Sequence, residues 1–312
     1  MQWAFDATRQ EWTVLSVGAD GKVLQWELGN KLRHPIKGSV LSKPGCGGKS
    51  SRKEYPLAYG GTALSLSGGT SAVAGSSLSR RPKWVLVGQE GGAIVRTQAK
   101  RALALGGKTL TKEDFKAAAR SGAELYASIR GSEVAGEGFR HEPHIGPVSS
   151  IDGSPFHRSL FLTGGRDGSV RLYHVLESAP LLQWEPSPPP GTSGVDGAYG
   201  AITAAAFSPI RPCVFAAASS DGFVYIFDLS VSTAAPCATL EAEAPADGGR
   251  SARRPALTDV CFNPKQRDLL AAADKGGRVH TWRLGWTLSN RQMNDQAALD
   301  AVALLATSAE AE

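Results

Sequence analysis

Three segments of this chain can be aligned with one another without a gap, and this repeat constrains the fold more than any other feature. The segments span residues 154–173, 208–227 and 263–282. Each begins with an x-Pro pair, continues through an apolar run to a glycine-containing turn, and ends at an aromatic side chain. The distance from the proline to the turn glycine is constant, because 168 − 155, 222 − 209 and 277 − 264 all give 13. Such a unit cannot bury its apolar face alone and must stack against its neighbours.

Two weaker copies of the repeat lie upstream. Residues 14–26 keep the turn and the aromatic at the usual distance from the turn glycine, since 26 − 21 and 173 − 168 both give 5. Residues 84–94 keep the pattern, but Thr97 stands where the other units have an aromatic. The chain therefore has five recognisable units, and we expect the first to be incomplete because most of its leading half is missing.

Alternating apolar and β-branched residues predict short strands in every unit. We expect a strand on each side of the turn in all five units, and leading strands at 62–67, 147–152, 202–207 and 257–262. The turns favour glycine at positive φ, and Asp-Gly pairs are strong hairpin signals. The predicted turn residues are Asp20, Gly21, Gly91, Gly92, Asp167, Gly168, Asp221, Gly222, Gly276 and Gly277. The pattern predicts an all-β fold of the β-propeller type.

The repeats define the expected domain organisation. We expect a partial propeller over residues 1–285 and a carboxyl-terminal tail over 286–312. Within the tail, a short amphipathic helix would place Leu299, Val302, Leu305 and Ala306 on one side, to dock on the repeat array or on a partner. A capping-box-like start at Thr111 predicts a second short helix. The expected loop insertions are 28–60, 67–82, 99–143, 185–200 and 241–255.

Composition narrows the protein class. The four cysteines show no paired spacing, and Cys213 and Cys261 fall in predicted strands as buried free thiols, which favours a reducing compartment. No apolar stretch reaches membrane-spanning length and residues 1–6 do not resemble a signal peptide, so we expect a soluble, intracellular protein without a membrane partner. The net charge of +5 comes from loops without interleaved aromatics, so we expect no direct nucleic-acid binding.

No catalytic, cofactor or metal site is predicted. Residues 45–50 (Gly-Cys-Gly-Gly-Lys-Ser) miss the phosphate-loop spacing, because Lys43 stands where the first glycine belongs. His141 and His144 lie in a predicted loop without a cysteine or carboxylate cluster to complete a metal site. The Ser-Pro-Phe-His segment that ends at His157 has a different sequence in each repeat, which favours a turn over a catalytic site.

The unit that ends in Tyr225-Ile226-Phe227-Asp228 resembles the WD repeat of β-propellers, although Phe-Asp replaces the usual Trp-Asp. Residues 15–26, 154–162 and 208–219 resemble the carboxyl-terminal propeller of dynein intermediate chains, above all the branch that serves intraflagellar transport. The most specific parts are Ser-Pro-Phe-His-Arg from Ser154 and Ser-Pro-Ile-Arg-Pro from Ser208.

The resemblance implies a non-catalytic subunit whose propeller binds a helical segment in the tail of a dynein heavy chain, in the cytoplasm and in the cilium or flagellum. Family members also carry an amino-terminal extension that binds dynein light chains, and on this resemblance we expect this chain to lack it. We therefore expect light chains and a second intermediate chain as partners only through the complex. Family propellers have about seven blades, so we expect a truncated gene product; the sequence identifies no heavy-chain contact residues.

Two other function classes stay open at this point. A different WD-repeat scaffold, such as an axonemal dynein intermediate chain or a ubiquitin-ligase adaptor, would share the fold, and fold alone does not separate these functions. An enzyme on a propeller would need converging carboxylates or histidines at the central channel, and the sequence gives no sign of them.

Overall fold

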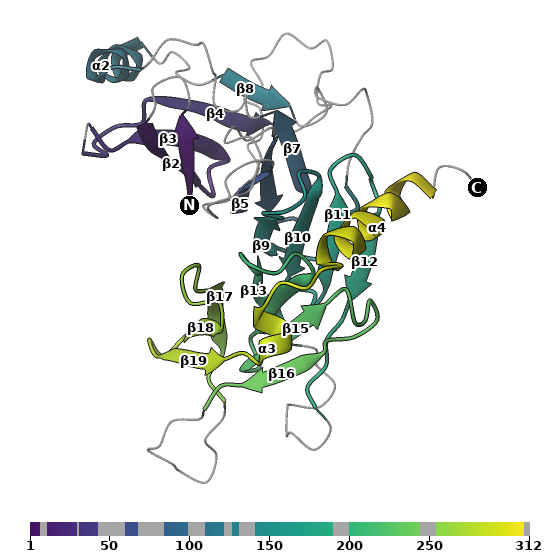
Figure 1. Ribbon diagram of the computed structural model, residues 1–312. Helices are drawn as coiled ribbons and strands as arrows, with labels where there is room; N and C mark the ends of the chain where they lie inside the picture. The colour runs from purple at the N-terminus through teal and green to yellow at the C-terminus, as the bar shows by residue number, and fades with distance from the viewer. Residues whose placement is uncertain are drawn as a thin grey trace.

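The computed structural model describes residues 1–6, 11–29, 31–42, 60–67, 84–98, 110–121, 127–130, 141–189, 200–243 and 254–308. Within these residues, five small β-sheets form an arc and follow one another along the chain, except that β8 returns to the first sheet (Figure 1). Each sheet is built from consecutive antiparallel strands, except that one parallel pair extends the first sheet. The all-β propeller-type fold predicted from the repeat is confirmed.

The third and fourth sheets are the most complete units. The third consists of β9 (Val148–Gly153), β10 (Leu160–Gly165), β11 (Val170–His174) and β12 (Pro180–Trp184). The fourth consists of β13 (Ile202–Phe207), β14 (Val214–Ser219), β15 (Phe223–Asp228) and β16 (Ala238–Glu241). In both, the fourth strand pairs antiparallel with the strand that follows the glycine turn.

The remaining sheets vary around this plan. The second comprises β5 (Gly61–Ser67), β6 (Trp84–Gln89) and β7 (Ile94–Gln98), and the last comprises β17 (Leu257–Phe262), β18 (Leu269–Asp274) and β19 (Val279–Arg283). The first contains β1 (Gln2–Asp6), β2 (Glu11–Val17), β3 (Lys22–Glu27), β4 (Lys37–Ser42) and β8 (Ala127–Arg130).

The first unit has a leading strand that the sequence comparison did not predict. β1 pairs with β2 from Gln2 opposite Leu15 to Asp6 opposite Glu11. No x-Pro pair follows this segment as one follows β9, β13 and β17, so the repeat pattern alone could not reveal it. Two expected loop insertions also contain strands, because β4 lies within 28–60 and β8 within 99–143.

The apolar core lies between neighbouring sheets rather than inside any one of them. Alternate residues along β15 point to opposite neighbours: Phe223, Tyr225 and Phe227 pack toward the third sheet, whereas Val224 and Ile226 pack toward the last one. This follows from the two-residue period of a strand, which sends successive side chains to opposite faces. Each sheet therefore depends on its neighbours for burial.

The cysteines follow the same rule. Cys213 is buried between the third and fourth sheets, as predicted. Cys261 is exposed, and the prediction that it is buried was wrong. Its strand, β17, alternates between Val260 and Phe262 on the covered face and Asp259 and Cys261 on the other. Sequence spacing marks the strand but does not tell which of its faces a neighbour covers.

The x-Pro pair of the repeat forms a polar turn in each of the three strongest units. Ser154 Oγ accepts hydrogen bonds from the backbone N–H groups of Phe156 and His157, at 3.3 and 3.2 Å. Ser208 and Asn263 occupy the same place and accept the corresponding pairs of N–H groups. A side-chain oxygen that bonds backbone two and three residues ahead fixes the chain reversal.

Among the described residues, three helices accompany the sheets. Helix α2 (Lys112–Ser121) lies beside the first sheet (Figure 1), and its predicted cap is present: Thr111 and Asp114 bond reciprocally, with Asp114 Oδ2 accepting from the Thr111 N–H at 2.8 Å. The tail forms α3 (Trp286–Ser289) and α4 (Asp295–Ser308). Helix α4 packs across the third and fourth sheets (Figure 1).

The buried face of α4 differs in part from the predicted one. Leu299, Val302 and Ala303 lie in the cluster between the third and fourth sheets. Leu305, predicted on the docking side, is 45% exposed. The side of α4 that packs against the sheets therefore includes Ala303 in place of Leu305. Val302, three positions after Leu299 and on the same side of the helix, and its neighbour Ala303 both contact the third and fourth sheets.

Candidate functional site

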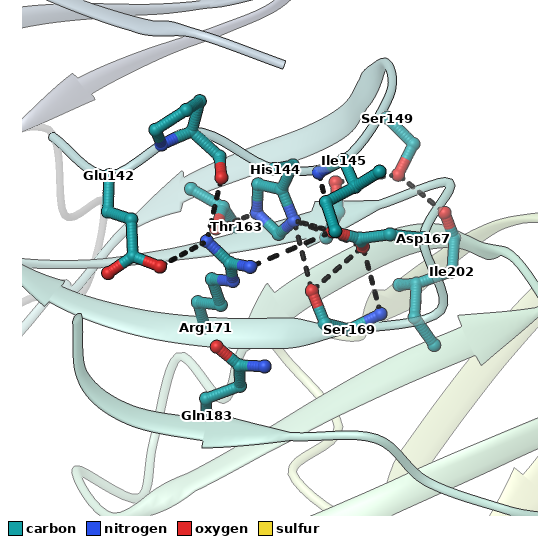
Figure 2. A network of polar contacts seen from close by, with 12 residues as sticks. Glu142, His144, Ile145, Ser149, Thr163, Asp167, Ser169, Arg171, Gln183 and Ile202 are labelled. Carbon is teal, nitrogen blue, oxygen red and sulfur yellow. Dashed lines mark hydrogen bonds and ion pairs between the residues drawn. The ribbon is translucent and has the colours of Figure 1, made fainter. Parts of the chain in front are cut away.

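A buried polar network ties the loop before β9 to the glycine turn between β10 and β11 (Figure 2). The His144 ring lies between Asp167 and Thr163, with Nδ1 3.0 Å from Asp167 Oδ2 and Nε2 2.7 Å from Thr163 Oγ1. Because a carboxylate only accepts hydrogen bonds, Nδ1 carries the proton and Nε2 accepts from the threonine hydroxyl. The sequence predicts both residues as loop or turn elements but does not reveal that they meet.

Asp167 organises the turn around this histidine. Its carboxylate accepts hydrogen bonds from the backbone N–H of Ile145 and from the N–H and hydroxyl of Ser169, at 3.0, 3.0 and 2.8 Å. Burial alone would raise the Asp167 pKa, but these bonds and the nearby His144 lower it. Burial lowers the pKa of His144, against the pull of the Asp167 charge. The pair is therefore a carboxylate beside a neutral imidazole near neutral pH.

A guanidinium extends the network along the loop. Arg171 Nη1 donates to the Pro143 carbonyl at 3.0 Å, and its Nη2 lies 3.8 Å from Asp167 Oδ2. The Tyr173 hydroxyl donates to the Glu142 carbonyl at 2.7 Å. Figure 2 shows Arg171 reaching from β11 toward the loop residues. Side chains of β11 therefore fix the loop that leads into the third sheet.

The network has the order of groups found in a nucleophilic triad: carboxylate, imidazole, hydroxyl. A triad also needs its hydroxyl at a surface that substrate can reach. Thr163 has 0% exposed surface and the His144 side chain also has 0%. A hydroxyl with no access attacks nothing, so we interpret this network as a structural lock between loop and sheet.

A second buried network holds the carboxyl-terminal tail. Arg211, which is 0% exposed, donates to Asp228 at 2.6 Å and to both oxygens of Asp295, at 3.1 and 3.2 Å. It also bonds the Ser230 hydroxyl and the Thr287 carbonyl. Burial would lower the Arg211 pKa, but the two carboxylates outweigh it and raise that pKa. One fully buried cation therefore joins the fourth sheet to α3 and to the start of α4.

The predicted turn residues lie where the strands of each sheet reverse. Gly21, Gly92, Gly168, Gly222 and Gly277 have φ of 71°, 86°, 81°, 87° and 84°, the region that favours glycine. Asp20 contacts Lys22, whose Nζ lies 2.8 Å away, and the Asp20 pKa is lowered chiefly by that bond. Gly91, Asp221 and Gly276 precede the positive-φ glycines. Of the ten, only Asp167 joins a polar network shown in Figure 2.

The phosphate-loop and metal-site candidates of the sequence form no such site among the described residues. Residues 45–50 lie outside the described residues. Among the described residues, no group of three or more histidine, cysteine or acidic side chains could hold a metal ion. None of the described helices is long and apolar enough to cross a membrane.

Comparison with known proteins agrees with the fold. The profile of the family described as WD domain, G-beta repeat matches residues 139–174, the segment that contains the His144 network. A chain of a crystal structure of the mitotic checkpoint complex superposes with a TM-score of 0.51 at 11% identity, covering 91% of this chain and 62% of that chain, which supports the fold alone. The class is thereby defined: the chain is a WD-repeat protein of the β-propeller type.

Its sequence is similar to dynein intermediate chains, as predicted. Cytoplasmic dynein 2 intermediate chain 2 of Homo sapiens is 32% identical over 291 residues, which cover 93% of this chain and 46% of the relative. Cytoplasmic dynein 2 intermediate chain 1 of Homo sapiens is 39% identical over 108 residues, covering 34% of this chain and 9% of the relative. The chain spans somewhat less than half the length of the first of these relatives.

Proposed function

We propose that this chain is a non-catalytic intermediate-chain subunit of a dynein motor that binds the heavy-chain tail and serves retrograde intraflagellar transport. The supporting observation is 32% identity to human cytoplasmic dynein 2 intermediate chain 2 over 93% of this chain. The structure is compatible with such a role, because its polar networks are internal locks and its rigid sheets can hold loops in fixed positions for a partner.

In this proposal residues 1–285 form the propeller part and 286–312 the tail. The heavy-chain tail is the direct partner, and the second intermediate chain and the light chains are reached through the assembled complex. The expected places are the cytoplasm and the cilium, at the axoneme and basal body. Membranes and nucleic acids are not proposed as partners.

The proposal is tested by affinity purification of the tagged chain from ciliated cells, followed by mass spectrometry of the eluate. We expect a dynein-2 heavy chain and dynein-2 intermediate chain 1. The matched control is the tagged Arg211→Met variant, which loses the buried clamp described above and should lose partners that need the native fold. An eluate with ubiquitin-ligase subunits and no dynein would replace the proposal with the adaptor alternative.

An axonemal role is the second candidate. Dynein axonemal intermediate chain 3 of Macaca fascicularis is 30% identical over 167 residues, which cover 51% of this chain. The shorter coverage favours the dynein-2 role. Recovery of axonemal outer or inner arm heavy chains in place of the dynein-2 heavy chain would reverse that preference.

A further inference from the structure

The chain that leads from the last sheet to α4 crosses the end of the fourth sheet as a ridge, and we call residues 286–294 the tail ridge. It consists of α3 and the connection from α3 to α4 (Figure 1). Arg211 holds the two ends of the ridge, because its guanidinium donates to the Thr287 carbonyl and to both oxygens of Asp295. Leu288 packs against the apolar cluster between the fourth and last sheets. A segment fixed in this way loses little conformational freedom when a partner binds.

The outward side of the tail ridge is apolar. Trp286 is 74% exposed, and Met293 is wholly exposed. Arg267 belongs to the x-Pro turn of the last sheet, and its guanidinium lies 5.7 Å from the centre of the Trp286 ring. The Arg291 guanidinium of the ridge lies 6.0 Å from the ring centre of Phe156, which belongs to the x-Pro turn of the third sheet. The ridge and these two turns therefore form one surface, at the end of the array that carries the x-Pro turns.

The exposed charges of this surface are positive. Lys265, Arg267 and Arg291 are exposed, and none of the three forms an ion pair with a described residue. Asp268 is the one acidic residue in the ridge and in the neighbouring turn segment 263–269, and it is partly buried. The positive charge is therefore available to carboxylates of a partner, which accept hydrogen bonds from a guanidinium group.

The composition of the surface favours a protein partner over a nucleic acid. Tryptophan, methionine and arginine are enriched where proteins bind one another, and tryptophan and arginine often carry most of the binding energy. A surface for single-stranded nucleic acid needs a groove of cations along the phosphates and aromatic side chains for successive bases. Here a few cations border one exposed tryptophan and one exposed methionine. An apolar stripe bordered by carboxylates complements this arrangement, and an amphipathic helix presents such a stripe.

We propose that the tail ridge binds an acidic amphipathic helix of a partner protein. The apolar stripe of the helix lies on Trp286 and Met293, as apolar anchors do in other complexes of this kind. Carboxylates along the border of the stripe pair with Arg267 and Arg291. Arg211 contributes from beneath, because it holds the ridge in one conformation before the partner arrives. This inference does not depend on the proposed function.

The test uses a terminally blocked peptide made of three repeats of Leu-Glu-Glu-Leu-Leu-Gln-Ala and the full chain labelled with fluorotryptophan. Trp286→Phe assigns the fluorine NMR resonance of Trp286 among those of the seven tryptophans. We expect the peptide to shift that resonance and to leave unchanged that of Trp3, an exposed tryptophan of the first sheet. A peptide with lysine in place of every glutamate and a scrambled peptide should bind about tenfold more weakly or worse.

Matched variants assign the contacts. Trp286→Ala should weaken binding of the acidic peptide about tenfold or more, the effect typical of a central tryptophan, whereas Trp3→Ala should leave binding unchanged. Arg291→Glu should weaken binding about three- to tenfold, the range expected when the charge in an exposed ion pair is reversed. Arg166→Glu, an equal charge change in the glycine turn of the third sheet, should have no effect. All four side chains are exposed, so circular dichroism should match that of the wild type.

Four results would overturn the proposal. A shift of the Trp3 resonance without one of Trp286 would place the peptide on another face of the molecule. Equal binding of the acidic and basic peptides would remove the electrostatic basis of the proposal. A Trp286 resonance that is the same in light and heavy water would show that another part of this chain covers the ridge. Tighter binding of a short single-stranded RNA at Trp286 would make a nucleic acid the occupant.

Discussion

The fourth and last sheets share one repeat pattern but have different surroundings. Val224 of the fourth sheet is 0% exposed, whereas its counterpart Val279 is 68% exposed. Phe223, Tyr225 and Phe227 are buried against the third sheet and α4, whereas Val224 and Ile226 are covered by the last sheet. The last sheet is covered on the face that packs against the fourth sheet. The repeat therefore encodes strand and turn, and burial depends on what stacks against each unit.

Polar contacts show the same difference. Arg211 and Gln266 occupy equivalent places after the x-Pro pair, since 211 − 209 and 266 − 264 both give 2. Arg211 is fully buried against two carboxylates, and Gln266 is exposed. One turn position thus carries the attachment of the tail in one sheet and a solvated side chain in the other. Matched substitutions at such positions test how far the two sheets differ.

The largest difference is expected at this pair. Arg211→Met leaves Asp228 and Asp295 buried without their cation, which should cost about 3–5 kcal/mol in the free energy of unfolding. Gln266→Met should change it by less than about 0.5 kcal/mol. Urea unfolding followed by tryptophan fluorescence measures both. Equal losses would show that the buried clamp does not hold the tail.

The turn glycines should give the next largest difference. Gly222 and Gly277 have φ of 87° and 84°, so alanine at either position costs about 1–3 kcal/mol in backbone strain. A Cβ at Gly222 would also approach Arg254 Cβ to 2.8 Å and the Pro255 carbonyl oxygen to 2.9 Å, while at Gly277 nothing lies within 4 Å. Gly222→Ala should therefore exceed Gly277→Ala by about 1 kcal/mol, as measured by thermal and urea unfolding. The reverse order would contradict the packing at this turn.

A smaller difference is expected for the paired valines. Val224→Ala removes two buried methyl groups and should cost about 1.5–2 kcal/mol. Val279→Ala, on the exposed strand, should stay within about 0.5 kcal/mol of wild type. The comparison uses urea midpoints at constant m-value. A clear loss for Val279→Ala would mean that this face is covered in solution.

A further expected effect concerns pH at the seam between the third and fourth sheets. Burial raises the pKa of Asp152 to about 7, although the Phe207 and Gly153 N–H groups lower it in part. Because the raised folded-state pKa lets the native state bind the proton more tightly, the stability that Asp152 contributes is complete below the unfolded pKa of 3.8 and is lost as pH rises toward 7. Asp152→Asn should flatten this slope in urea titrations between pH 4 and 8. An unchanged slope would assign the dependence to another group.

Sequence patterns recovered the strands beside the turns and most leading strands, because alternation and turn glycines are local properties. They did not predict the fourth strands β12 and β16 or the strand β4, whose segments lack a glycine turn on their outer side. They also gave the wrong burial for Cys261 and Leu305. Both errors concern which face meets a neighbour, a property that local spacing does not contain.

The polar networks lay further beyond sequence reasoning. His144 and Asp167 are 23 residues apart, and Arg211 and Asp295 are 84 apart, with no motif that connects either pair. The variable sequence after each x-Pro pair predicts a turn, and the structure has that turn in all three units. The same variability does not predict that Arg211 is buried against two carboxylates while Gln266 is exposed. The apolar residues that flank Arg211 in the sequence indicate a buried position. The carboxylates that bind Arg211 come from other elements, so the sequence does not identify them.

By itself, the sequence determined the repeated unit, its glycine turns and the propeller-type class, because strand period and backbone sterics act over a few residues. The tertiary structure decided which faces are buried and how Arg211 fastens the tail. These features depend on segments brought together from distant parts of the chain. Burial and ion pairing are properties of the stacked sheets, and no single repeat contains them.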